Sequence, residues 1–348
     1  MARFWDLPAG RLLATNNVPG SCTVAEFSPD STRLLAGTAQ GLILVCDALS
    51  GGELLRYTNH QRSLLSSRIY ALTISPDSRR VLSGAADNTA QLWDLHTGAP
   101  LCEPLRHDHW VTATQLSPDG QRFLTAELNR GVFQWQLRPG PAAPLRIAEA
   151  EGIRAVAFAP IDASQTLITV ATNGAVRARD PRTGALLRTL REPATPLEFA
   201  GFDSLRRQLA LADTKHQVTL LDLASGEARL CDTPGAGRVG WFDFSRDGQR
   251  LALAAGADVF VCDTATGRLA AGPFRCQTGP AIFGHRLYRV RFSPDGAKLV
   301  TACHDMHARL WDVATGRVLA DLAHGGGVSS AEFSPDGAAV LTASFDSP

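Results

Sequence analysis

Short apolar runs alternate with polar turns along the whole chain, and the turns use the same residue types each time. An apolar residue followed by Ser-Pro-Asp, as at residues 292–295, is typical of a strand end and a tight turn. The apolar run at residues 298–300 and the alternating run at residues 90–94 each predict a further strand. A Thr-Gly or Ser-Gly turn, as at Thr97-Gly98, then leads into a fourth strand. The pattern predicts units of four short antiparallel strands.

Two sequence marks repeat at a nearly constant spacing. The first is a Trp-Asp pair or a degenerate copy of it, and its copies, 41 to 49 residues apart, are Trp5-Asp6, Cys46-Asp47, Trp93-Asp94, Trp135-Gln136, Arg179-Asp180, Leu221-Asp222, Cys262-Asp263 and Trp311-Asp312. The second is the apolar residue and turn, found at residues 27–30, 74–77, 116–119, 158–162, 202–204, 244–247, 292–295 and 333–336. Such a period indicates stacked repeats, and four antiparallel strands per repeat are typical of a propeller blade.

With these marks the chain resembles the WD-repeat family of β-propellers over essentially its whole length. The resemblance implies a hydrogen-bonded tetrad in each blade, made of a His, a Ser or Thr, an Asp and the Trp. The family spacing is met by His107, Thr125, Asn129 and Trp135, and in part by Ser83, Asp87 and Trp93 and by Thr301, Asp305 and Trp311. His60 and His285 are candidates to complete the last two sets, at spacings that differ from the family's. Blades with Cys46, Arg179, Leu221 or Cys262 at the Trp position are expected to rely on packing.

The two ends of the chain predict how many blades there are. The chain begins at a third strand with Trp5 and stops after a second strand, where His324, Thr342 and Asp346 supply the other three tetrad places. We therefore expect an all-β, eight-bladed β-propeller of four-stranded antiparallel blades, closed by a composite blade from both chain ends, as a single domain over residues 1–348. Closure would remove exposed sheet edges. The alternative is a fragment of a longer WD-repeat signalling protein.

Composition narrows the class of protein. The chain has 34 basic and 34 acidic residues, which disfavours a protein that coats nucleic acid. Lys215 and Lys298 are the only lysines, and this Arg-rich, Ala-rich usage favours a bacterial source. Neither a signal peptide nor an apolar run long enough to span a membrane is visible, so a cytoplasmic location is expected.

No motif in the sequence predicts catalysis or a bound cofactor. The seven cysteines are widely spaced and odd in number, which favours neither a disulfide framework nor a zinc pair. The clusters at residues 107–109 and 303–307 contain metal-ligand residue types, but His107 and Asp305 already have tetrad roles, so no metal is predicted. Quinone-dependent propeller enzymes share the Asp-x-x-Thr-Gly turn, yet the Trp that follows it in them is absent here. The chain is therefore predicted not to be an enzyme, with no catalytic residue and no cofactor.

A binding surface is the remaining expectation, and the repeat register places it. Seven positions before the Ser of each turn, the chain has Arg68, Trp110, Arg238 and Arg286. Two positions later it has Tyr70, Thr112, Arg154 and Tyr288. Arginine and aromatic side chains are enriched at protein interfaces, and arginine suits carboxylate or phosphate groups. We expect a monomeric interaction platform that binds a protein or peptide, acidic or phosphorylated, through this face. The alternative is a propeller enzyme or small-molecule binder that uses the central channel.

Overall fold

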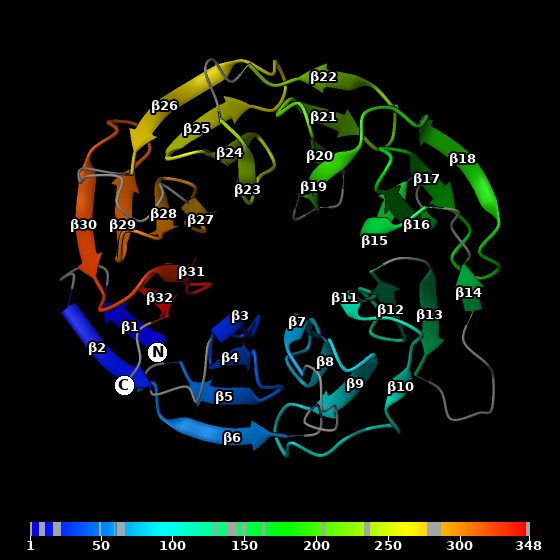
Figure 1. Cartoon of the computed structure of the whole chain (residues 1–348), viewed down its shortest axis with the longest axis horizontal. Helices are drawn as coiled ribbons and strands as arrows, with labels where there is room; N and C mark the ends of the chain where they lie inside the picture. Colours follow the sequence, from blue (N-terminus) through cyan, green and yellow to red (C-terminus); the bar gives the residue numbers. More distant parts are fainter. Residues whose placement is uncertain are drawn as a thin grey trace. The chain divides into compact units, whose positions relative to one another are not determined.

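A computed structural model describes residues 2–6, 11–16, 22–48, 50–58, 60, 67–128, 131–137, 145–147, 151–161, 164–203, 205, 207–232, 237–276 and 287–345. Asn129, Asp162, Ser204, His285, Arg286 and Asp346 carry sequence predictions but lie outside these residues. The described residues form eight four-stranded antiparallel sheets, the blades of an eight-bladed β-propeller fold (Figure 1). Within the described part, no helix combines the length and the apolar character needed to cross a membrane.

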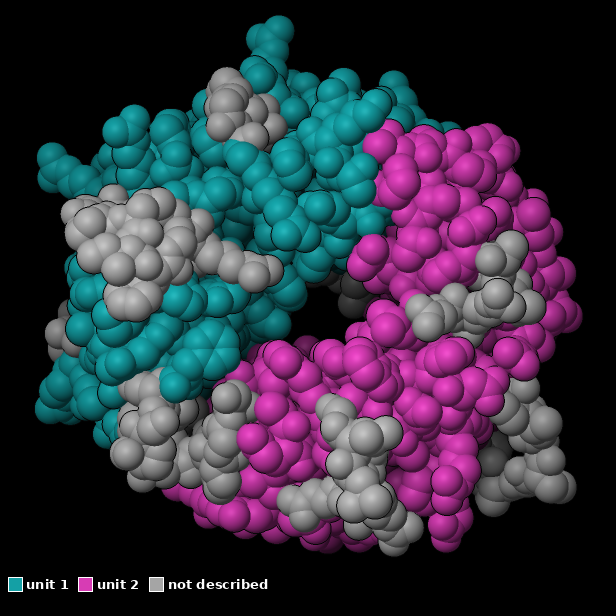
Figure 2. All heavy atoms as spheres, viewed as in Figure 1, with its two compact units in different colours: residues 1–17, 197–348 teal, residues 18–196 magenta. Residues whose placement is uncertain are grey.

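The chain divides into two compact units, which are coloured separately in Figure 2. Residues 18–196 hold blades 1 to 4. Blade 1 has β3 (Cys22–Phe27), β4 (Arg33–Thr38), β5 (Ile43–Asp47) and β6 (Glu53–Tyr57). Blade 2 has β7 (Ile69–Ile74), β8 (Arg80–Ala85), β9 (Thr89–Asp94) and β10 (Leu105–Arg106). Blade 3 has β11 (Val111–Leu116), β12 (Arg122–Glu127), β13 (Val132–Gln136) and β14 (Leu145–Ile147). Blade 4 has β15 (Ile153–Ile161), β16 (Ser164–Ala171), β17 (Val176–Arg179) and β18 (Leu186–Arg191).

Residues 1–17 and 197–348 form the other unit, with blades 5 to 8. Blade 5 has β19 (Leu197–Phe202), β20 (Gln208–Asp213), β21 (Val218–Asp222) and β22 (Ala228–Leu230). Blade 6 has β23 (Val239–Phe244), β24 (Arg250–Ala255), β25 (Asp258–Asp263) and β26 (Leu269–Arg275). Blade 7 has β27 (Leu287–Phe292), β28 (Lys298–Cys303), β29 (His307–Asp312) and β30 (Val318–Ala323). Blade 8 has β1 (Ala2–Asp6), β2 (Arg11–Asn16), β31 (Val328–Phe333) and β32 (Ala339–Ser344).

Blade 8 is the composite blade predicted from the chain ends. Its strand order is β2-β1-β32-β31, and β1 pairs antiparallel with β32 from Ala2 opposite Ala343 to Asp6 opposite Ala339 (Figure 1). The chain therefore completes this sheet with strands from both of its ends.

The turns hold the strands by short side-chain hydrogen bonds. In the Ser-Pro-Asp turn of blade 2, Ser75 Oγ donates to Asp77 Oδ1 at 2.5 Å, and the Arg80 amide donates to Ser75 Oγ at 2.9 Å. In the Trp-Asp turn, Asp94 Oδ1 accepts from the backbone amide of Thr97 at 2.8 Å. Gly98 follows with φ of 72°, a left-handed conformation that glycine adopts without steric cost. The same two turns recur because the same residues recur.

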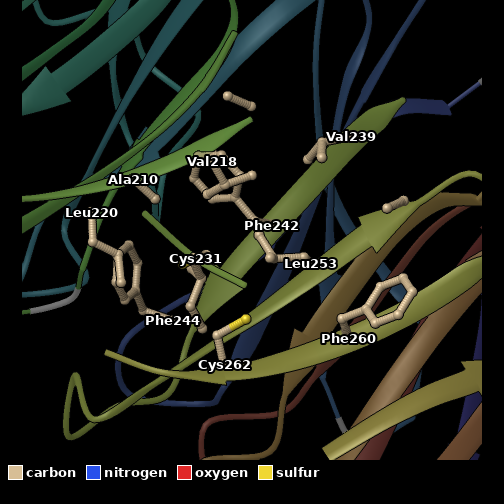
Figure 3. Packing of buried hydrophobic residues seen from close by; sticks show 13 residues of the cluster. Ala210, Val218, Leu220, Cys231, Val239, Phe242, Phe244, Leu253, Phe260 and Cys262 are labelled. Carbon is tan, nitrogen blue, oxygen red and sulfur yellow. The ribbon is translucent and has the colours of Figure 1, made fainter. Parts of the chain in front are cut away.

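The core lies between consecutive blades. Second strands such as β8 and β20 are buried on both faces, which explains their nearly continuous apolar sequence. Figure 3 shows one such layer, where Val218 and Leu220 of blade 5 belong to one apolar cluster with Phe242, Phe244 and Cys262 of blade 6. Cys262, at a Trp position, is fully buried there, as expected for a blade that relies on packing.

Candidate partner-binding surface

A register shift marks the start of every first strand. Pairing with the second strand skips one residue in each blade, and the skipped residues are Thr23, Tyr70, Thr112, Arg154, Glu198, Gly240, Tyr288 and Ser329. A bulge of this kind takes one residue out of the ladder and re-aims its side chain. We call these eight residues the bulge row. Tyr70, Arg154 and Tyr288, singled out in the sequence, all belong to it.

Three of the predicted residues lie together in blades 2 and 3. The Tyr70 and Trp110 rings stack with centroids 5.7 Å apart and planes 27° from parallel. Arg68 Cζ lies 5.8 Å from the centroid of the Tyr70 ring. Trp110 remains 42% exposed, and Arg68 is exposed as well. A guanidinium, a phenol and an indole thus form one accessible stack, which we call the Arg68–Tyr70–Trp110 stack.

The other predicted residues have separate surroundings. Arg154, on β15, is exposed. Arg238 Nε donates to Glu198 Oε2 at 2.9 Å, so its charge is paired with the bulge-row residue of blade 5. Tyr288 lies with its ring 5.9 Å from His304 and 5.9 Å from Phe345. Arg286 lies outside the described residues.

The tetrad of blade 2 is complete. His60 Nε2 lies 2.7 Å from Ser83 Oγ, which accepts a hydrogen bond from Trp93 Nε1 at 2.9 Å. His60 Nδ1 lies 3.1 Å from Asp87 Oδ2. The unusual spacing of His60 in the sequence is therefore compatible with the tetrad.

Blade 3 departs from the predicted tetrad. Trp135 Nε1 donates to Thr125 Oγ1 at 2.9 Å, as expected. His107, however, contacts Glu127, with 3.3 Å between Nδ1 and Oε1, and its buried Nε2 makes no hydrogen bond to Thr125. Burial lowers the pKa of His107 to about 4 and raises the pKa of Glu127. The prediction that His107 bonds Thr125 was wrong, because a carboxyl group two residues further along β12 attracts the imidazole.

Blade 7 uses a cysteine where the family has a histidine. The backbone amides of His107 and His324 donate to a turn carbonyl of the preceding blade, and Cys276 does the same, to Ala257 O at 3.2 Å. Its thiol donates to Phe274 O at 3.6 Å, and Thr301 accepts from Trp311 Nε1 at 3.0 Å. Only this backbone bond identifies the position, since the following loop differs in length between blades.

A second cluster, on the first strands of blades 5 to 8, was not predicted. Arg289 Cζ lies 4.4 Å from the Trp241 ring centroid, and Phe199 packs on the same indole at 4.8 Å. Arg289 Nη1 also donates to Ser330 Oγ at 3.1 Å. The equivalent positions in blades 2 to 4 hold Ala71, Ala113 and Ala155. We call Phe199, Trp241, Arg289 and Ser330 the aromatic ladder.

A charged row accompanies the aromatic ladder two residues further along the first strands of blades 6 to 8. Arg291 Nη1 donates to Asp243 Oδ1 at 2.9 Å, and its Nη2 lies 3.8 Å from Glu332 Oε1. Burial raises the pKa of Glu332, although Arg291 and Arg289 oppose the shift. No single motif marks these residues; only a comparison of equivalent positions in every repeat could have found them.

Metal-ligand residue types do not converge in the described residues, where no group of three or more His, Cys, Asp or Glu side chains could hold an ion. His307, from the second suspected cluster, lies 2.6 Å from Asp321 by its Nδ1. Cys303 is buried.

Comparison with known proteins supports the fold and the repeats. The family model "WD domain, G-beta repeat" matches residues 52–94, 277–312 and 316–347. An uncharacterized WD repeat-containing protein of Synechocystis sp. is 29% identical over 170 residues, which are 45% of this chain and 46% of that protein. The match thus spans about half of either protein.

Solved structures share the fold at low identity. The computationally designed protein Ika8 superposes with a TM-score of 0.74 at 21% identity, covering 97% of this chain and 99% of that one. The β-propeller domain of Cps50 (Swd1) from Myceliophteria thermophila gives a TM-score of 0.66 at 16% identity, covering 95% and 99%. At these identities the likeness concerns the fold alone.

Proposed function

This chain is a WD-repeat β-propeller protein, and we propose that it acts as a non-catalytic, cytoplasmic interaction platform for a protein or peptide partner. The observation that carries the proposal is the Arg68–Tyr70–Trp110 stack. An exposed indole stacked on a phenol presents a large, rigid contact area, the kind of anchor that dominates protein interfaces.

The charge beside the stack favours an acidic or phosphorylated partner. Arg68 and Arg154 are exposed on the first strands of blades 2 and 4 or just before them. A guanidinium can donate two parallel hydrogen bonds to a carboxylate or phosphate, and its attraction reaches about 8 Å at physiological salt. A partner would place an apolar group on Trp110 and an anion near Arg68.

The test compares capture by variants of the whole chain. The wild type, Trp110→Ala, Arg68→Ala and Leu187→Ala would each be immobilised and exposed to lysate of the source cells, with mass spectrometry of the bound proteins. Leu187, on β18, is 60% exposed and serves as the matched control for removing a surface apolar side chain. We expect a partner retained by wild type and Leu187→Ala and lost with Trp110→Ala, with unchanged melting temperatures. A partner held equally by all four would reject this surface.

A small-molecule binder is the second candidate, and the aromatic ladder with its charged row favours it. Two arginines, two carboxylates and an indole gather on consecutive first strands, within half-buried surroundings. Such convergence of polar groups beside an aromatic surface is typical of ligand sites. A screen of small planar anions by melting temperature, repeated with Trp241→Leu, would decide: ligand-induced stabilisation that Trp241→Leu abolishes supports it.

A further inference from the structure

An arginine recurs in the grooves between consecutive blades. It is the first residue of the second strand, and it donates to a turn carbonyl of the next blade. Arg33 Nη1 donates to Leu95 O at 3.0 Å, Arg80 Nη1 to Gly120 O at 3.2 Å, and Arg122 Nη1 to Pro181 O at 3.5 Å. Three consecutive grooves thus contain a guanidinium supplied by the chain itself.

Blade 5 has Gln208 at this position. Its Nε2 donates to Gly248 O at 3.3 Å, the same kind of carbonyl, but without charge. Between blades 5 and 6 lies a cavity of about 370 Å³ lined by Gln208, Asp222, Asp247, Asp263 and Thr264. Glu227 and Arg229 also line this cavity.

The next groove, between blades 6 and 7, offers an internal comparison. It is of similar size, about 440 Å³, and its lining residues occupy equivalent positions: Arg250 for Gln208, Asp295 for Asp247 and Asp312 for Asp263. Arg250 Cζ lies 5.6 Å from the Phe292 ring centroid. The two grooves therefore differ in charge: the second contains Arg250 from the second strand, whereas the first is lined by Asp222, Glu227 and Arg229, whose Nη1 donates to Ala265 O at 2.8 Å.

Cations of the chain balance only part of the acidic charge of the first groove; besides its turn hydrogen bonds, the charge of Arg250 lowers the pKa of Asp247. Arg229 Nη2 pairs with Glu227 Oε2 at 2.7 Å, which accounts for both charges. Asp222, Asp247 and Asp263 remain, and the hydrogen bonds that the described residues make to them all go to Oδ1, within their own turns. Each Oδ2 is thus available to another donor. Turn hydrogen bonds also hold the pKa of Asp247 and Asp263 below the ordinary value, so both are ionised at neutral pH.

We propose that the groove between blades 5 and 6 binds an arginine side chain of a partner protein. A guanidinium has five donors in a plane, which suits a wall of several carboxylates and turn carbonyls better than the compact charge of lysine. It is also the group that this fold places in equivalent grooves. The site lies at the Ser-Pro-Asp and Trp-Asp turns, away from the bulge row, and does not depend on the function proposed above.

The experiment titrates the whole chain with N-acetyl-arginine amide, which mimics an arginine within a protein, and follows binding by ligand-observed NMR. N-acetyl-citrulline amide, equal in shape but uncharged, is the matched ligand. We expect saturable binding in the millimolar range for the arginine compound, weaker by about tenfold or more for the citrulline compound. Free arginine, whose carboxylate the acidic wall repels, should bind more weakly than the amide. Tighter binding of free arginine would overturn the assignment to a partner protein.

Two reciprocal variants locate the site. Gln208→Arg restores the arginine of the other repeats and should abolish binding by occupying the groove; Gln208→Lys serves if that variant does not fold. Arg250→Gln removes the internal guanidinium from the neighbouring groove and should create a second binding equivalent. Equal binding of the citrulline compound, or unchanged binding in both Gln208 variants, would overturn the proposal.

Discussion

Trp5 and Thr342 are 337 positions apart in the sequence and share a hydrogen bond of 2.8 Å from the indole Nε1 to the hydroxyl Oγ1. It is the composite blade's version of the bond between Trp and Ser or Thr that blades 2, 3 and 7 also contain. The indole of Trp5 also lies edge-on to His324, with centroids 5.8 Å apart. This side-chain contact adds to the backbone pairing of the first strand with the last.

Replacing Thr342 with Val should weaken this connection. Valine has nearly the same shape, so the change leaves the Trp5 donor without its acceptor in a partly buried site, which costs about 1–3 kcal/mol. The urea midpoint should fall accordingly. Thr15→Val, on exposed β2 of the same sheet, is the control and should change the midpoint little. An equal effect of both substitutions would contradict a specific role of the Trp5 bond.

Much of this architecture could be predicted because repeats encode it locally. The turn residues and the Trp-Asp marks each specify a conformation through neighbours a few positions away, and their period then sets the blade count. The composite blade 8 could be predicted because Trp5 and Thr342 are recognisable parts of the same tetrad motif. Positions within a repeat can likewise be aligned from the sequence, which places Tyr70 and Tyr288 in one row. In the structure both residues lie at the register shift of a first strand.

What escaped prediction depends on contacts between blades or on loops of variable length. The distance between the Trp241 and Arg289 side chains is set by how two first strands lie beside one another, and nothing within either repeat signals it. Cys276 takes the histidine position of blade 7 ahead of a loop whose length differs from that of other repeats. Glu127 displaced Thr125 as the partner of His107 through packing and not through a motif.

The Ser83 hydroxyl should be the most sensitive polar group of blade 2. It contacts both His60 and Trp93 in a fully buried position, so Ser83→Ala leaves two groups unsatisfied. We expect a loss of about 2–4 kcal/mol, more than for Thr125→Val in blade 3, where only Trp135 loses its partner. Urea midpoints of the two variants, measured side by side, check the order. A smaller loss for Ser83→Ala than for Thr125→Val would refute the importance of the complete tetrad.

The burial of His107 leads us to expect that the protein loses stability in mild acid. Its folded pKa of about 4 lies below the ordinary 6.5, so the folded state favours the neutral ring. The free energy of unfolding that this preference contributes is fully present above pH 6.5. It is lost as the pH falls toward 4, by about 3 kcal/mol at most. The raised pKa of Glu127 acts in the opposite sense, since protonation favours the folded state.

The measurement therefore starts from Glu127→Gln, which removes the opposing carboxyl. Melting temperatures between pH 7 and pH 4 should fall more steeply for Glu127→Gln than for Glu127→Gln/His107→Asn. All other residues are the same in both proteins, so the difference between the curves reports on His107. Parallel curves would show that His107 does not titrate as its burial implies.

Close approach between blades makes Gly84 intolerant of a methyl group. A Cβ added there would lie 2.7 Å from Val111 Cγ1, a side chain of the next blade that is itself fully buried. The valine cannot move away without displacing blade 3, so Gly84→Ala should cost about 1–3 kcal/mol by overpacking. Gly240→Ala is a suitable control, because its new Cβ would approach no closer than 3.4 Å, to Leu287 O.

A second substitution separates overpacking from a backbone effect. Gly84→Ala/Val111→Ala removes the 2.7 Å contact with Val111 Cγ1 and leaves contacts of 3.1 Å with the Cβ of residue 111 and with Thr114 Cγ2, so the double variant should lose less stability than the sum of the two single changes. Overpacking predicts this non-additivity, whereas a conformational preference of residue 84 would leave the two losses additive. A Cβ added at Gly37 would lie 2.8 Å from Ile69 Cγ2 and 2.9 Å from Val24 Cγ1, so the same cycle on Gly37 and Ile69 should give the same sign. Additive losses in both cycles would show that the glycines are required for reasons other than close packing between blades.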